Sequence, residues 1–122
     1  MHRQHRYKEM VGKPKGELLP GTLEMLILAA LRREPLHGYA IAQSIHQGSG
    51  HLLRAEEGSL YPALQRLLIQ GWVSAKWGVS SRNRKVRVYT LTTTGRKELS
   101  IQRQFMERQF DGFTRMMRFS ES

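Results

Sequence analysis

The chain of 122 residues contains no cysteine. This absence excludes a disulfide framework, a thiolate nucleophile and a cysteine-based zinc site. Long hydrophobic runs are missing as well, because the longest, Met25 to Leu31, has seven residues, whereas a membrane-spanning helix needs about 20. We therefore expect no membrane segment, and we expect the protein to act in the cytoplasm.

Catalytic and metal-binding constellations are also absent from the sequence. Ser59 has no recognisable His and acid partners, and neither a glycine-rich phosphate loop nor paired carboxylates occur. His46 and His51 are five residues apart, and His2 and His5 are three apart, in both cases without a third ligand. We therefore expect no catalytic residues, no metal site and no cofactor.

Acidic residues are missing from one long stretch of the chain. Residues 58–97 contain no Asp or Glu but eight Lys and Arg, so they supply +8 of the formal net charge of +10. A concentrated cationic face releases the counterions of a polyphosphate when it binds, which favours nucleic acid as the partner. An acidic protein is an alternative partner, and an anionic membrane surface is the weakest one.

Apolar residues three and four apart predict three helices in the first 70 residues. The first covers about residues 20–33 and ends before Pro35. The second, of about ten residues, begins near Gly38. The third runs from about residue 57 or 58 to 70, and Pro62 favours a start near Ser59 as N-cap or a slight bend.

A change of period after Gly71 predicts a hairpin. β-branched and aromatic residues indicate strands over about 72–77 and 86–91, on either side of the basic turn at 80–85. Residues 51–54 are a candidate one-rung strand that could pair with this hairpin. Thr92 or Thr93 then caps a last helix.

The last helix carries a seam of large apolar residues. They follow one another at steps of seven, four, three and four: Leu99, Met106, Phe110, Phe113 and Met117. The earlier helices are expected to pack against one another, so a second copy of the chain is the simplest partner for this seam. The alternative is that part of this soft surface lines a cavity for a small apolar or aromatic effector. Gly112 is expected to bend or fray the helix.

This order of elements predicts an α+β fold, mostly α, namely a winged helix-turn-helix with a long C-terminal dimerisation helix. We expect a flexible basic arm over residues 1–17, a winged helix domain over 18–92 and the dimerisation helix over 93–122. The arm is either a solvated tail or a segment that touches phosphate or the minor groove.

The third helix and the turn of the hairpin supply the candidate DNA contacts. With Leu60, Leu64, Leu67 and Leu68 facing the core, the outward residues of the helix are Ser59, Tyr61, Pro62, Gln65 and Arg66. Arg suits a guanine edge or a phosphate, Gln suits adenine, and hydroxyls suit phosphate oxygens. In the turn, Arg82, Arg84 and Lys85 form a cationic tip without a counter-charge.

Three motifs resemble the markers of one family. Residues 58–67 (GSLYPALQRL) with 71–73 (GWV), residues 37–41 (HGYAI) and residues 89–95 (YTLTTTG) resemble the PadR family of bacterial transcriptional regulators. The resemblance implies a homodimeric winged-helix repressor that dimerises through its C-terminal helix, in the short subgroup with a single such helix. Two segments differ from the usual family pattern. Residues 68–70 (LIQ) stand where relatives usually have acidic residues, and residues 80–83 (SSRN) stand where they usually have a Gly-rich wing. The second difference leaves open how the wing tip sits on DNA.

The sequence therefore predicts a DNA-binding transcriptional regulator, a homodimeric repressor on a two-fold-related operator in double-stranded DNA. Release by a small apolar effector is part of this interpretation. Two alternatives stay open: a basic RNA- or ribosome-associated winged-helix module, and a protein-interaction adaptor that uses the apolar last helix.

Overall fold

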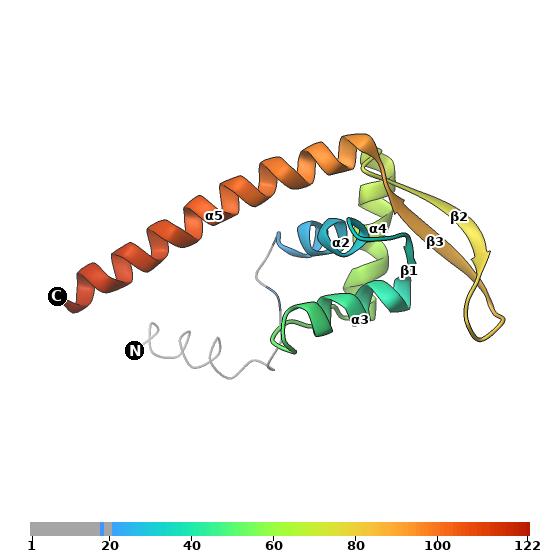
Figure 1. Ribbon diagram of the computed structural model, residues 1–122, viewed down its shortest axis with the longest axis horizontal. Coiled ribbons are helices and arrows are strands. Elements are labelled where there is room, and N and C mark those ends of the chain that lie inside the picture. Colours follow the sequence, from blue (N-terminus) through green and yellow to red (C-terminus); the bar gives the residue numbers. More distant parts are fainter. Residues whose placement is uncertain (1–17, 19–20) are drawn as a thin grey trace.

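The computed structural model describes residue 18 and residues 21–122. The elements are α2 (Leu23–Leu31), β1 (Leu36–His37), α3 (Gly38–Gly48), α4 (Glu57–Gln70), β2 (Val73–Val79), β3 (Lys85–Leu91) and α5 (Thr93–Glu121) (Figure 1). The basic arm predicted over residues 1–17 lies outside the described residues. The fold is α+β and mostly α, which confirms the predicted winged helix.

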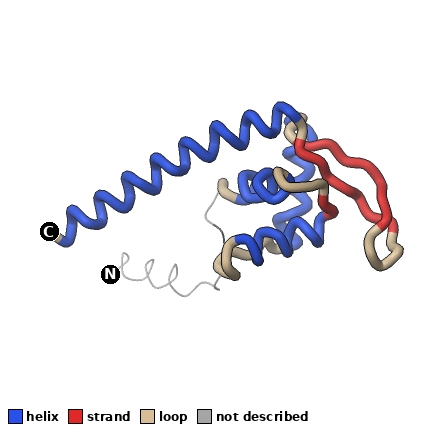
Figure 2. Tube along the Cα trace, in the orientation of Figure 1, coloured by secondary structure: helices blue, strands red, loops and turns tan. Residues whose placement is uncertain are grey.

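One small core holds the winged body together. Helices α2, α3 and α4 pack on one another, and the hairpin of β2 and β3 extends beside them as the wing (Figure 2). The largest fully buried side chains are all aliphatic: Ile27, Leu28, Leu31, Ile41, Leu64 and Leu67. Leu99, from the second turn of α5, is also part of this core.

The sheet has the order β1-β3-β2, and its short edge strand is not where the sequence placed it. Leu36 and His37 pair with Tyr89 and Val88, so the prediction of a strand at 51–54 was wrong. That segment is instead the turn between α3 and α4. A hydrogen bond from the Leu53 amide to the Ser49 hydroxyl (3.0 Å) closes this turn.

Helix α4 begins three residues earlier than a Ser59 cap requires. Glu56 is the N-cap, and its carbonyl accepts from the amides of Ser59 (3.0 Å) and Leu60 (2.9 Å), so the predicted Ser59 cap was wrong. The helix continues through Pro62 and ends at Gly71, whose φ of 77° is readily adopted by glycine.

The start of α5 is fastened to the root of the wing. The Thr92 hydroxyl accepts from the Gly95 amide (3.0 Å) and donates to the Gly71 carbonyl (2.7 Å), which confirms Thr92 as the cap. A Cβ on Gly95 would overlap the carbonyl oxygen of Trp72, an oxygen that already accepts from the Thr92 amide. Only glycine therefore lets the first turn of α5 approach the wing this closely.

Beyond Leu99, α5 leaves the body and projects away from it (Figure 1). The helix runs without interruption to Glu121, so it does not fray at Gly112. Of the predicted seam, Leu99 is buried in this chain's own core, whereas Phe110, Phe113 and Met117 are exposed. No helix in the described part of the chain is long and apolar enough to cross a membrane.

Candidate nucleic-acid interface

Helix α4 has one buried side and one exposed side. Leu60, Ala63, Leu64 and Leu67 are buried, and Leu68 is half-buried at the edge of the core. The predicted outward residues are all exposed: Ser59, Tyr61, Pro62, Gln65 and Arg66. The helix therefore offers a polar face whose side chains are exposed on the outside of the fold.

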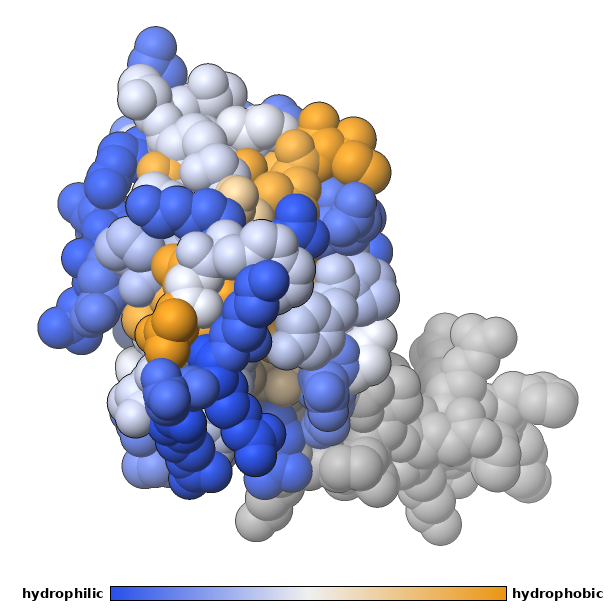
Figure 3. Space-filling view, turned by 90° about the vertical axis from the view of Figure 1, so that its right-hand side faces the viewer, coloured by the Kyte–Doolittle hydropathy of each residue, from blue (hydrophilic) through white to orange (hydrophobic). Residues whose placement is uncertain are grey.

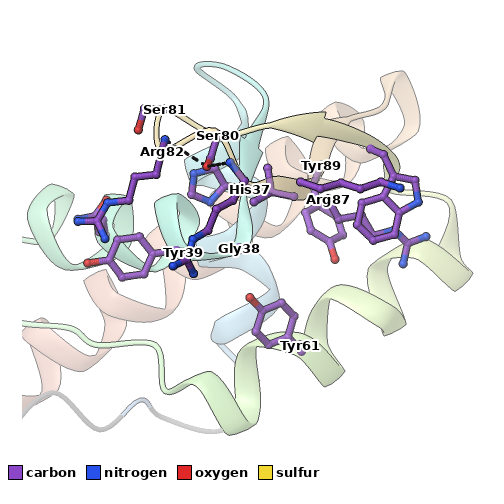
Figure 4. Close-up of a pocket in the computed structure, with 14 residues that line it drawn as sticks. His37, Gly38, Tyr39, Tyr61, Ser80, Ser81, Arg82, Arg87 and Tyr89 are labelled. Atoms are coloured by element: carbon purple, nitrogen blue, oxygen red, sulfur yellow. Dashed lines mark hydrogen bonds between the residues drawn. The ribbon is translucent and has the colours of Figure 1, made fainter.

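The tip of the wing is a tight polar turn. The Ser80 amide donates to the Arg84 carbonyl (2.8 Å), and the Ser80 hydroxyl accepts from the amides of Arg82 (3.3 Å) and Arg84 (3.2 Å) (Figure 4). Asn83 adopts a left-handed conformation with φ of 60°. Asn is among the few residues other than Gly that visit this region, which explains how a tip without glycine closes.

The wing and the body enclose a groove, called here the wing groove. It is a hollow of about 720 Å³ between the hairpin, the start of α3 and α4. Its aromatic members are Tyr39, Tyr61, Trp77 and Tyr89, and its cationic members are Arg82, Arg84, Lys85 and Arg87 (Figure 4). Among the described residues that line it, none is acidic. The face that carries the wing is largely hydrophilic (Figure 3).

Tyr61 joins helix α4 to this groove. Its ring packs on Gly38, where an added Cβ would lie 2.8 Å from the Tyr61 hydroxyl oxygen. The preceding His37 caps α3, since its Nδ1 accepts from the Ala40 amide (3.4 Å). The His-Gly pair therefore starts α3 and leaves the space that Tyr61 occupies.

The hairpin register brings further groove residues together that the sequence analysis had not assigned. Trp77 lies opposite Arg87 across the two strands, and Lys85 Nζ lies 5.0 Å from the centroid of the Trp77 ring. Both strands follow a period of two, so aligning them about the basic turn could have identified this face. No comparable sequence pattern identifies Tyr39 as a groove residue, because its position depends on where α3 begins.

Tyr89 forms the inner wall of the groove. It is only 4% exposed, and burial raises the pKa of its phenol, while the nearby Arg87 acts in the opposite direction. The hydroxyl therefore stays protonated at neutral pH and is available as a donor to an anion.

Arg66 lies apart from the groove residues, on the flank of α4 that faces α2. Its Nη2 is 2.6 Å from Oε1 of Glu24, although the Arg66 side chain remains 56% exposed. Glu24, which lies outside the acid-free stretch of residues 58–97, thus pairs with Arg66, one of the cations within that stretch. A DNA contact by Arg66 has to share its guanidinium with Glu24 or replace that carboxylate.

Comparison with known proteins agrees with this architecture. Residues 27–101 match the transcriptional regulator PadR-like family. Over 78 residues the chain is 30% identical to the negative transcriptional regulator PadR of Bacillus subtilis, covering 64% of this chain and 43% of that protein. The chain thus spans less than half of that relative's length.

Two solved structures are informative. A PadR family transcriptional regulator from Eggerthella lenta is 29% identical, with a TM-score of 0.72 and 96% of each chain covered. Bacillus subtilis PadR in complex with operator DNA is also 29% identical, with a TM-score of 0.58, covering 65% of this chain and 46% of that chain.

Proposed function

The chain belongs to the PadR-like family of transcriptional regulators, which are not enzymes, and we propose that it is a homodimeric repressor of a two-fold-related operator. One observation carries the proposal. Tyr61 of the recognition helix and the cations of the wing tip line a single groove, so both elements face the same side of the body. A duplex could therefore contact the exposed side of α4 and the wing together.

The two elements have different tasks in this proposal. Helix α4 enters the major groove, where Gln65 reads adenine and Arg66 contacts a guanine edge or a phosphate. Ser59, Tyr61 and Pro62 lie along the DNA backbone beside that groove, and the hydroxyls of Ser59 and Tyr61 donate to phosphate oxygens. Arg82, Arg84 and Lys85 bind phosphates beside the wing, and the aromatic walls of the wing groove pack against the sugars. RNA is not favoured, because the exposed α4 face suits a wide major groove.

Dimerisation is assigned to the outer part of α5, which makes residues 18–92 the DNA-binding domain and 93–122 the dimerisation element. Met106, Phe110, Phe113 and Met117 follow one stripe of a helix of 29 residues. Such a helix is about 43 Å long at 1.5 Å per residue. It can hold two winged bodies about one turn of DNA apart, which is the half-site spacing of a two-fold operator, about 34 Å.

Repression is inferred from kinship, since the Bacillus subtilis relative is a negative regulator. A dimer that covers an operator can exclude other proteins from it. The proposed place of action is the cytoplasm, where bacterial DNA is accessible. A small apolar effector that releases the dimer would complete the regulatory cycle.

Selection of bound sequences from a random duplex pool tests the function. We expect enrichment of an inverted repeat with half-site centres about 10 base pairs apart. A competition titration of the selected duplex against RNA hairpins should favour the duplex. Enrichment of no sequence, or preferential binding of the hairpins, would contradict the proposal and favour an RNA-associated module.

A further inference from the structure

The ion pair between Glu24 and Arg66 differs from the other ion pairs of the described residues. Those others lie within α5 and join positions four apart along that helix. The pair of Glu24 and Arg66 instead joins two elements, α2 and α4, which pack on each other. Of the eight cations in residues 58–97, Arg66 alone has an acidic partner in the part of the chain that the structure describes.

The stability of the fold does not explain this pair. The Glu24 side chain is 27% exposed, and that of Arg66 is exposed still further. An ion pair so open to solvent contributes little to folding, because water screens the attraction and two side chains lose freedom. On a surface that meets DNA, the carboxylate also repels the phosphates. A role in recognition explains why an acid is placed there.

Glu24 is the fixed partner of the pair, and Arg66 is the side chain that it holds. Glu24 lies in the first turn of α2, where the helix dipole favours an acid. The following residues Ile27 and Leu28 anchor this helix in the core. The bond from Arg66 Nη2 to Glu24 Oε1, at 2.6 Å, uses one of the five N–H groups of the guanidinium. The held side chain therefore keeps an edge with two parallel donors for a ligand.

The two DNA partners considered for Arg66 respond differently to this carboxylate. A phosphate is attracted by net charge, which Glu24 cancels. The O6 and N7 atoms of guanine are neutral acceptors that require two aligned donors, and Glu24 supplies the alignment. An arginine that is already held also loses less rotamer freedom when it binds. The ion pair therefore favours a guanine edge over a phosphate.

We propose that Glu24 is a positioning residue for sequence recognition, which orients Arg66 toward the O6 and N7 edge of a guanine and keeps phosphate away from the same guanidinium. Glu24 thereby lowers the affinity for random DNA and raises the discrimination in favour of the operator. This inference rests on the proposed function and decides between the two contacts considered there for Arg66.

Glu24→Gln removes the charge and keeps the size of the side chain. The affinities of the full-length chain for the selected operator and for a random duplex are measured by fluorescence anisotropy over a salt series. In the variant, Arg66 is released to a phosphate, so random duplex should bind about threefold more tightly, with a salt slope larger by about 0.9. The ratio of operator affinity to random affinity should fall about tenfold. Glu57→Gln, which removes the same charge from the first turn of α4, should leave this ratio unchanged.

Modified operators provide a readout that a purely structural role would not change. Each guanine is replaced singly by 7-deazaguanine, which lacks the N7 acceptor but keeps its base pairing. At one position per half-site, the replacement should weaken wild-type binding about fivefold. The same replacement should weaken binding of Glu24→Gln and of Arg66→Gln less than about twofold, because neither presents the aligned fork. Glu24→Ala, which suits a helix, serves the same purpose should Glu24→Gln fail to fold.

The outcomes separate this inference from the proposed function. A wild type that selects an operator, together with an unchanged affinity ratio in Glu24→Gln, would reject the role of Glu24 alone. Equal loss of affinity for operator and random duplex would also reject it, because Glu24 would then only support the fold. Insensitivity of the wild type to every 7-deazaguanine would show that Arg66 does not read guanine N7. Absence of any sequence selection by the wild type would reject the proposed function and this inference with it.

Discussion

The winged body and the outer part of α5 use apolar residues in opposite ways. Among the residues that the structure describes, every buried hydrophobic residue lies between Ile27 and Leu99, and none lies in residues 100–122. Yet that outer part carries large exposed side chains, including Phe105, Phe110 and Phe113. The body covers its own hydrophobic surface, whereas the exposed apolar side chains of outer α5 are not covered by any part of the chain that the structure describes.

The apolar core of the body is therefore closed, whereas the apolar stripe of outer α5 is left exposed. An isolated helix in water is only marginally stable, and a helix with an exposed apolar stripe gains stability from a second surface. The proposed function therefore places folding and DNA contact in the body and assembly in outer α5.

The largest expected effect concerns assembly. Phe110→Glu places a charge in the seam and should raise the dimer dissociation constant about a thousandfold, equivalent to about 4 kcal/mol. Analytical ultracentrifugation over a concentration series measures this. Gln104→Glu adds the same charge at an exposed position off the seam and should leave the dimer intact. An unchanged dimer in Phe110→Glu would move the interface elsewhere.

The junction between the two regions should come next. Gly95→Ala forces the start of α5 away from the Trp72 carbonyl and should lower the free energy of unfolding by about 3 kcal/mol. Gly112→Ala, with nothing within 4 Å of the added Cβ, should instead raise it by about 1 kcal/mol. Urea denaturation compares them, and similar values for both variants would refute the tight junction.

A third change affects DNA contact without affecting the core. Gly38→Ala displaces the Tyr61 ring and should weaken duplex binding about tenfold, or about 1.4 kcal/mol. Gly48→Ala, in the same helix with open space around the added Cβ, is the control. In a Tyr61→Ala background, Gly38→Ala should cost nothing more. A persisting loss there would mean that Gly38 acts by another route.

The smallest effect is expected at the wing tip. Asn83→Val puts a β-branched residue in a left-handed conformation, at a local cost of about 1–2 kcal/mol, and should weaken duplex binding a few-fold. Asn83→Gly preserves the turn and should bind like the wild type. Mobility-shift titration measures both, and equal binding by Asn83→Val and Asn83→Gly would show that the tip geometry is unimportant.

Local patterns explain how much of the fold could be predicted from the sequence. The three helices, the hairpin and the Thr92 cap depend on spacing within a few residues, and they were found. Strand β1 was misplaced because its two residues are defined by pairing with Tyr89 and Val88, half the chain away. The Ser59 cap failed because the Glu56 carbonyl starts the helix without a side-chain cap.

The candidate site was predictable to a similar degree. The outward side of α4 followed from helical spacing, and the cationic tip followed from composition. The pairing of Arg66 with Glu24 joins residues 42 positions apart, which no local pattern reveals. Likewise, Leu99 fits the heptad spacing of the seam, but the packing of α5 on α2 places it in the core of the body.

The salt dependence of duplex binding tests the central claim most directly. For the selected operator, the logarithm of the binding constant should fall steeply with the logarithm of salt concentration in the wild type. The triple variant Arg82→Gln, Arg84→Gln, Lys85→Gln should show a slope smaller by about two to three, at about 0.9 per lost phosphate contact. Equal slopes in the two proteins would contradict a DNA surface built from α4 and the wing.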